Sequence, residues 1–298
     1  MRRFLRSIWR VLTAPFRLLA RPFRAVARFL NHEPEEAPTG DVLTRTLENP
    51  AALLEHLQAL RAHLLRSLLV LAVAVGISFA FAQQILDWMA APIGGIGALQ
   101  AIEVTESVGA FMRVSLLTGF ALSLPYLIVE AFAFVNPGLH RRERITLLVL
   151  IPLAVLMFAV GLWFAYYVML PVALPFLTSF MGIRTIPRPA NYIQFVTTVM
   201  FWVGVAFEFP LLMFALATIG VVDAPAMLRA WKVAVLGIAV AAAVITPTPD
   251  PVNMALLMGP LLALYFLGIL FAAAAGRRRS RRRDSRGTTP TLTGVGGQ

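Results

Sequence analysis

Six long apolar runs, almost free of charged residues, fill the chain from residue 67 to residue 276. They occupy residues 67–86, 114–134, 145–183, 190–222, 233–249 and 251–276, with Glu130 and Glu208 as the only charged residues inside them. A helix needs about 20 apolar residues to cross the ~30 Å hydrocarbon core of a bilayer. Six such runs in series predict an all-α, polytopic membrane protein with six transmembrane helices. An even number of spans leaves both chain ends on one side.

The third run is too long for a single span. Residues 145–183 contain no charge over 39 positions. Pro171 and Pro175 lie in its second half, and proline ends or kinks a helix because it lacks an N–H and its ring clashes with the preceding turn. We therefore predict a helix to about Leu170 and a loop after it.

The last two spans are predicted to be short or broken. Residues 233–245 provide only ~20 Å of helix at 1.5 Å per residue, and Gly259-Pro260 predicts an interruption of the sixth span. Secondary transporters also use short or broken helices, so a small-solute transporter is the alternative interpretation. The chain has no convincing internal repeat of three spans, and this absence counts against a transporter.

Basic residues predict the orientation of the spans. Of the 26 basic residues, 23 would lie on the side of the chain ends, in the segment up to Arg66, the loops after the second and fourth spans, and the tail. The other side would hold only Arg184 and Arg188, with Arg113 at the edge of a span. Because loops rich in Lys and Arg stay in the cytoplasm, both termini are expected there.

The segments outside the spans predict three further parts. Residues 1–30 hold seven arginines within an arc of about 60° when wound as a helix, with apolar residues opposite. Such a helix lies in the interface of a bilayer with anionic lipids, although an organelle transit peptide is an alternative. Residues 31–54 read as an acidic, Pro-containing linker before a membrane domain at 55–275, and residues 276–298 as a basic, disordered tail.

Composition excludes several classes of function. The chain is 59% hydrophobic and only 14% charged, against about 45–50% and 25% in soluble domains, so a soluble enzyme is excluded. The net charge of +11 suits nucleic acid or an anionic membrane, and the apolar content favours the membrane. With no cysteine, four scattered histidines and no glycine-rich phosphate loop, we expect no metal, no cofactor, no nucleic acid and no enzymatic activity.

Five short motifs occur in order along the six-span frame. They are HLQALR at residues 56–61, Thr105-Glu106 leading to Phe111 and Arg113, FAFVNPGL at 132–139 followed by Glu143-Arg144, FEFP at 207–210, and TPTPD at 246–250. From residue 56 to about residue 275 the chain thereby resembles the TatC subunit of the twin-arginine protein translocase. Each motif alone is weak, but five at matching positions are a strong signal.

The resemblance implies protein export across the cytoplasmic membrane. TatC-like proteins receive folded precursors that carry a twin-arginine signal peptide, and the proton-motive force drives transport. They assemble with single-span partners of the TatA and TatB type. A homo-oligomer within the complex is also expected.

A pair of arginines calls for carboxylates, because the guanidinium fork fits carboxylate oxygens in a bidentate manner. Glu143 is the leading candidate for signal-peptide binding, since the matching loop glutamate contacts the signal peptide in the family; a local ion pair with its arginine neighbours is the alternative. The other residues assigned to this site are Phe134 and Pro137, which would shape the loop, and Glu55, Arg61 and Glu130. The family motif has glutamate where this chain has Ala59, and Glu55, one helical turn earlier, lies on roughly the same face.

Two further groups of residues carry expectations. Glu208 lies near the middle of the fourth span, where an ionisable side chain is costly unless it is neutral, paired or wet. By the same resemblance, Glu208 with Pro210 is expected on a concave face that contacts the single-span partners within the membrane or locally thins the bilayer. A protonated glutamate that is hydrogen-bonded to a neighbouring helix for structure alone is the alternative. Glu106, Arg113 and Asp250 are expected in the periplasmic cap and turns, with Arg113 paired to Glu103 or Glu106 and Asp250 forming a turn.

Overall fold

The computed structural model describes residues 50–136, 141–179, 185–246 and 250–287. The expected N-terminal helix at residues 1–30, most of the linker, Pro137 and the end of the tail from residue 288 lie outside these residues. Within them there is no strand. The helices are α3 (Pro50–Ser78), α4 (Ala82–Ala90), α5 (Glu106–Val135), α6 (Arg141–Phe164), α7 (Leu170–Ser179), α8 (Pro189–Phe207), α9 (Phe209–Ile219), α10 (Ala224–Arg229), α11 (Trp231–Ile245) and α12 (Pro251–Gly287).

The helices confirm the predicted set of six spans. Five stretches are long and apolar enough to cross a membrane: Leu54–Ile93, Glu106–Val135, Arg144–Ser179, Pro189–Ile219 and Pro251–Gly276. The sixth span is α11, which has only 15 residues, as the short run at 233–245 predicts. The side chains exposed along α3, including Leu64, Leu68 and Val73, form an apolar surface suited to lipid.

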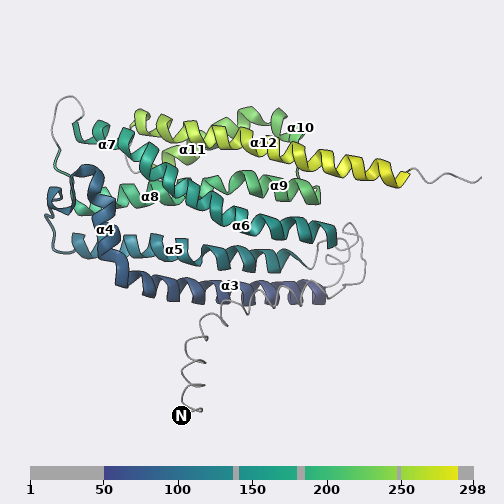
Figure 1. Ribbon diagram of the computed structural model, residues 1–298, viewed down its shortest axis with the longest axis horizontal. Coiled ribbons are helices and arrows are strands. Elements are labelled where there is room, and N and C mark those ends of the chain that lie inside the picture. Colours follow the sequence, from purple (N-terminus) through teal and green to yellow (C-terminus); the bar gives the residue numbers. More distant parts are fainter. Residues whose placement is uncertain (1–49, 137–140, 180–184, 247–249, 288–298) are drawn as a thin grey trace, which may run out of the picture. The chain divides into compact units, whose positions relative to one another are not determined.

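Helix α8 lies at the centre of the packing. It contacts α5 and α6, whereas α9 packs along α12 and α11 packs beside α12 (Figure 1). Glycines allow the closest approaches between helices, as small residues do in membrane bundles. A Cβ added to Gly161 of α6 would lie 2.8 Å from the Cα of Gly204 in α8, and one added to Gly119 of α5 would lie 2.6 Å from the Cα of Val75 in α3.

The predicted loop after Leu170 is wrong. The chain continues as helix from Arg141 to Ser179, through a π-helical turn at Ala165–Met169 that leads directly into α7. Pro171 has no N–H for the carbonyl one turn earlier, and the wider π turn just before it shifts the backbone hydrogen bonds there. Local π adjustments of this kind let transmembrane helices tolerate proline. The third span is therefore one long helical unit.

The interruption predicted at Gly259-Pro260 is also absent, since α12 is continuous through Pro260. Proline removes one backbone hydrogen bond but does not break a transmembrane helix whose neighbours hold it in place, and α9 packs along α12. The helix continues to Gly287, into the segment where the sequence predicts the tail. The first span, in contrast, divides at Phe79–Phe81, a short 3-10 turn between α3 and α4.

Candidate functional site

Two ends of the helical unit carry most of the polar contacts. At the base end, α3 begins, α5 ends at Val135 and α6 begins at Arg141. The cap, at the opposite end, consists of residues 82–105, which include α4, together with residues 185–188 before α8.

At the base end, a buried carboxylate joins α3 to α5. Glu130 of α5 is buried, and its Oε2 lies 2.5 Å from Nδ1 of His63 in α3. Its other oxygen accepts a hydrogen bond of 2.5 Å from the Tyr126 hydroxyl. The Arg66 guanidinium lies 3.6 Å from Oε2. Glu130 is thus fully engaged within the chain and does not extend to water.

Aromatic stacking extends this contact toward the start of α3. The Phe134 ring stacks on His56 with centroids 4.6 Å apart, and it meets His63 edge-on at 6.0 Å. Seven residues make almost two helical turns, so His56 and His63 share one face of α3. That spacing is the signal through which sequence reasoning could have found the contact of His63 with Phe134; from the sequence His63 was only one of four histidines without metal-ligand spacing.

Among the remaining residues predicted for signal-peptide binding, Glu55, Arg61 and Glu143 lie on helices that begin at the base end. Glu55 and Arg61 are exposed on α3, and Ala59 is half-buried. Glu143 lies in the first turn of α6, where the positive end of the helix dipole favours an acidic residue. Pro137 lies outside the described residues. The base end therefore brings together α3, the end of α5 and the first turn of α6.

The fourth span divides at Glu208. Glu208 is the C-cap residue of α8 and the N-cap residue of α9. Pro210, which is fully buried, has no backbone N–H to donate there. Among the residues that the structure describes, Oε1 of Glu208 is buried without a hydrogen-bond partner. A polar atom of this kind inside an apolar bundle is costly, which makes Glu208 a candidate for a role beyond packing.

The cap is held by an arginine that sequence reasoning did not select. The Arg188 guanidinium binds Glu106, with Nε 2.9 Å from Oε1, and its Nη2 lies 3.1 Å from Glu103. Hydrogen bonds to Glu106 and then to Glu103 raise the pKa of Arg188, so its charge is retained. The expected pairing of Arg113 with these glutamates is wrong, because Arg188 enters from the start of α8 and occupies them.

Tyrosines tie the cap to the bundle. The hydroxyl of Tyr166 donates to the carbonyl of Trp88 at 2.6 Å, and the hydroxyl of Tyr192 donates to the carbonyl of Met89 at 2.7 Å. The Trp88 and Tyr166 rings also stack, with centroids 3.8 Å apart. These contacts fix α4 against the third and fourth spans.

Asp250 caps α12, which agrees with its expected role as a turn-forming residue. Its Oδ1 accepts a hydrogen bond of 2.7 Å from the backbone N–H of Asn253, and its Oδ2 accepts one of 2.9 Å from the Asn253 side chain. Pro251 follows at the first helical position. Aspartate before a helix and proline at its first position are both favoured there.

Metal-ligating side chains are not gathered in the part of the chain that the structure describes. No three His, Asp or Glu side chains there could hold a metal ion. His63 and Glu130 meet, but the positive guanidinium of Arg66 beside them would repel a cation.

Comparisons with known proteins agree with this arrangement. Residues 55–260 match the family model of the Sec-independent protein translocase protein TatC. The chain is 35% identical over 231 residues to the Deinococcus radiodurans protein of that name, covering 74% of this chain and 86% of the relative. It is 34% identical over 253 residues to the chloroplastic TATC of Arabidopsis thaliana, covering 84% and 72%.

A solved structure shows the same fold. The crystal structure of the twin-arginine translocase receptor TatC is similar, with a TM-score of 0.66 and 28% sequence identity, and the match covers 74% of this chain and 99% of that one. These matches exclude the small-solute transporter and identify a transport component rather than an enzyme. The chain belongs to the TatC family, the multi-pass membrane subunits of the Sec-independent protein translocase.

Proposed function

We propose that this subunit recognises twin-arginine signal peptides at the base end and exports folded precursors with the proton-motive force. The observation that carries the proposal is the joining of α3 to α5 through His63 and Glu130. This contact holds the motif at residues 56–61 beside Phe134, close to the end of α5 that leads into α6. A peptide at the base end could therefore contact α3, α5 and α6 at once.

Carboxylates decide where an arginine pair can bind. Glu143 is the leading ligand, in the first turn of α6 among Arg141, Arg142 and Arg144. These arginines repel a basic peptide, so recognition needs a carboxylate that is not consumed by them. Glu55 is the second ligand and compensates for Ala59.

Phe134 shapes the apolar side of this site, and Pro137 restricts the loop that follows it. Glu130 acts differently in this proposal. Its bonds to His63 and Tyr126 make it a positioning residue that sets α3 against α5. Arg61 is exposed on α3 and is assigned to the site through the motif at residues 56–61.

Binding of a twin-arginine peptide to variants of the purified protein tests the site. Glu143→Ala should weaken binding by about 30-fold, since truncating one partner of a shielded charge pair costs ~2 kcal/mol or more. Glu55→Ala should also weaken it, and Ala59→Glu should strengthen it. Asp87→Ala, which removes an exposed carboxylate of α4 in the cap, is the matched control. If Glu143→Ala binds the peptide like the parent, the assignment of Glu143 fails.

The orientation proposed is that the base end and both termini face the cytoplasm and the cap faces the periplasm. Support comes from the excess of arginine in the segments that flank the base end and from the arginine cluster after Gly276. The chain has no cysteine, so single cysteines report topology without interference. A cysteine at Asp250 should react with a membrane-impermeant reagent from the periplasmic side. Labelling from the cytoplasmic side would reverse the proposed topology.

Glu208 is proposed as a contact for TatA-type and TatB-type single-span subunits, with Pro210 holding the helix break open beside it. The unpartnered Oε1 supports a role beyond packing, because a buried polar atom without a hydrogen bond is costly, and the Glu208 side chain as a whole is only half-buried. Glu208→Gln keeps the shape of the side chain and removes its ability to ionise. Loss of crosslinking between this span and a single-span partner is the expected result. Export and crosslinking equal to the parent would show that Glu208 serves only packing.

A further inference from the structure

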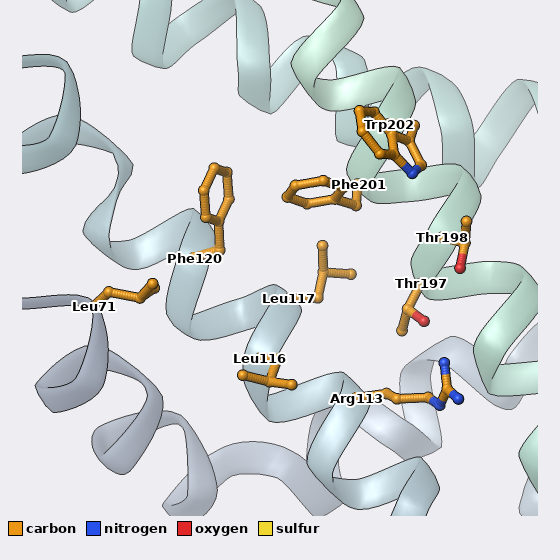
Figure 2. A pocket seen from close by; sticks show the side chains of 9 residues that line it. All are labelled: Leu71, Arg113, Leu116, Leu117, Phe120, Thr197, Thr198, Phe201 and Trp202. Carbon is orange, nitrogen blue, oxygen red and sulfur yellow. The ribbon is translucent and has the colours of Figure 1, made fainter. Parts of the chain in front are cut away.

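A groove of about 320 Å³ opens between α3, α5 and α8 (Figure 2). Leu71 of α3, Leu117 and Phe120 of α5, and Phe201 and Trp202 of α8 form its apolar walls. Phe120 and Phe201 meet edge-to-face, with ring centroids 5.0 Å apart. All of these residues belong to stretches apolar enough to cross a membrane. Walls of this kind suit a hydrocarbon chain.

One cation lies in the groove, and no acidic residue lines it. Arg113 is exposed and contributes to the lining. Glu103 and Glu106, the carboxylates that the sequence suggested for it, bind Arg188 instead. In residues 50–136, 141–179, 185–246 and 250–287, no carboxylate lies within ion-pair distance of Arg113. Its charge is therefore left for a ligand.

The position of Arg113 along α5 defines its depth. It lies seven residues beyond Glu106, the first residue of the helix, which corresponds to ~10 Å along the axis. From there a long arginine side chain reaches the head-group region of the cap-side leaflet while its stem stays on apolar surface. Figure 2 shows Thr197 and Thr198 of α8 on the same side of the groove as Arg113. The Thr197 hydroxyl donates to the Ile193 carbonyl of its own helix, so Thr198 is the residue whose hydroxyl adds polar surface there.

We propose that this groove binds an anionic phospholipid from the cap-side leaflet. The lipid phosphate accepts two hydrogen bonds from the N–H groups of Arg113, because the guanidinium fork matches the spacing of two phosphate oxygens. One acyl chain lies along Phe120, Leu117 and Phe201. The Thr198 hydroxyl donates to the head group.

The charge of the lining favours an anionic lipid over a zwitterionic one. Both carry a phosphate, but the ammonium group of a zwitterionic head group would find no carboxylate in the groove and would be repelled by Arg113. Basic pockets between transmembrane helices bind anionic head groups for this reason. The apolar segment of a signal peptide could fill the walls, but it would leave the Arg113 charge without a partner.

Site-directed crosslinking tests the proposal on the full-length protein in nanodiscs. The probes are phosphatidylglycerol and phosphatidylcholine that carry the same photoactivatable acyl chain, and crosslinked peptides are mapped to α5 and α8. Phosphatidylglycerol should label the groove about tenfold more than phosphatidylcholine, which corresponds to a single charge-assisted contact. Arg113→Gln should abolish the preference, and Arg113→Lys should retain most of it. Arg229→Gln, which removes an exposed arginine outside the groove, should change nothing.

Thr198→Trp provides a second variant, because it fills the groove while leaving Arg113 unchanged. It should reduce labelling by both lipids. Equal labelling by the two lipids, or a preference that persists in Arg113→Gln, would overturn the proposal. If a signal peptide occupies the groove instead, the lipid probes will crosslink to the added peptide and not to α5 and α8, and that result would also overturn the proposal.

Discussion

Removing the Glu130 carboxylate is the most informative perturbation of the base end. In Glu130→Ala, the His63 imidazole and the Tyr126 hydroxyl each lose a partner at 2.5 Å. Arg66 also loses a carboxylate at 3.6 Å, but its side chain is 53% exposed, and exposed ion pairs contribute little. The effect should therefore come from the two short hydrogen bonds.

The expected loss of stability is about 2–3 kcal/mol. Hydrogen bonds to a charged group contribute ~1.5–3 kcal/mol each in soluble proteins. Interhelical hydrogen bonds in membrane proteins average only ~0.6 kcal/mol and reach ~1.7. Two bonds of roughly 1–1.5 kcal/mol each, within that membrane range, give the expected value. His63 and Tyr126 are also left without a partner in a part-buried contact, which adds to the loss of stability.

Equilibrium unfolding of the purified protein in detergent measures this loss. A double-mutant cycle with His63→Ala should give a coupling of about 1 kcal/mol or more, as expected for residues in one hydrogen-bond network. Glu55→Ala is the matched control, because Glu55 lies exposed on the same helix as His63 and should change stability by less than ~0.5 kcal/mol. If Glu130→Ala is no less stable than Glu55→Ala, Glu130 does not hold the two helices together.

Three further outcomes are expected. Gly161→Ala should destabilise the fold, because the added Cβ would lie 2.8 Å from the Gly204 backbone. Gly109→Ala should not, because nothing lies within 4 Å of its added Cβ. Equal melting temperatures of the two variants would contradict the close approach. Arg188→Gln should increase proteolysis of the cap relative to Arg229→Gln, since Glu106 loses its guanidinium, and unchanged cleavage would argue against that role. A peptide of residues 1–30 should become helical on anionic vesicles and lose most of its affinity in high salt, whereas equal binding to neutral vesicles would refute the electrostatic attraction.

The number of spans could be predicted from sequence because each span depends on a local property. About 20 apolar residues must satisfy their backbone hydrogen bonds within the segment, and a helix is the form that does this. The short α11 follows from the same count. The continuity at Pro171 and Pro260 could not be predicted, since it depends on π turns and on packing against other helices. A proline rule derived from soluble helices overestimates breaks in such surroundings.

The partners of charged side chains were harder to predict than the helices. Sequence distance favours Arg113, seven residues from Glu106, over Arg188 as the partner of that carboxylate. Only the fold brings Arg188, 82 residues away, to Glu106. The same holds for His63 and Glu130, which are 67 residues apart. Asp250, by contrast, caps the helix that follows it directly, so a local rule predicted its role.

Recognition of a twin-arginine signal peptide at the base end requires discrimination between peptides that differ only in their basic pair. The purified full-length protein is titrated with a labelled twin-arginine peptide and with the same peptide in which both arginines are lysine. Lysine keeps the charge but lacks the bidentate fork, so the twin-arginine peptide should bind about tenfold or more tightly. Equal affinity for the two peptides, or no binding of either, would contradict the proposed recognition.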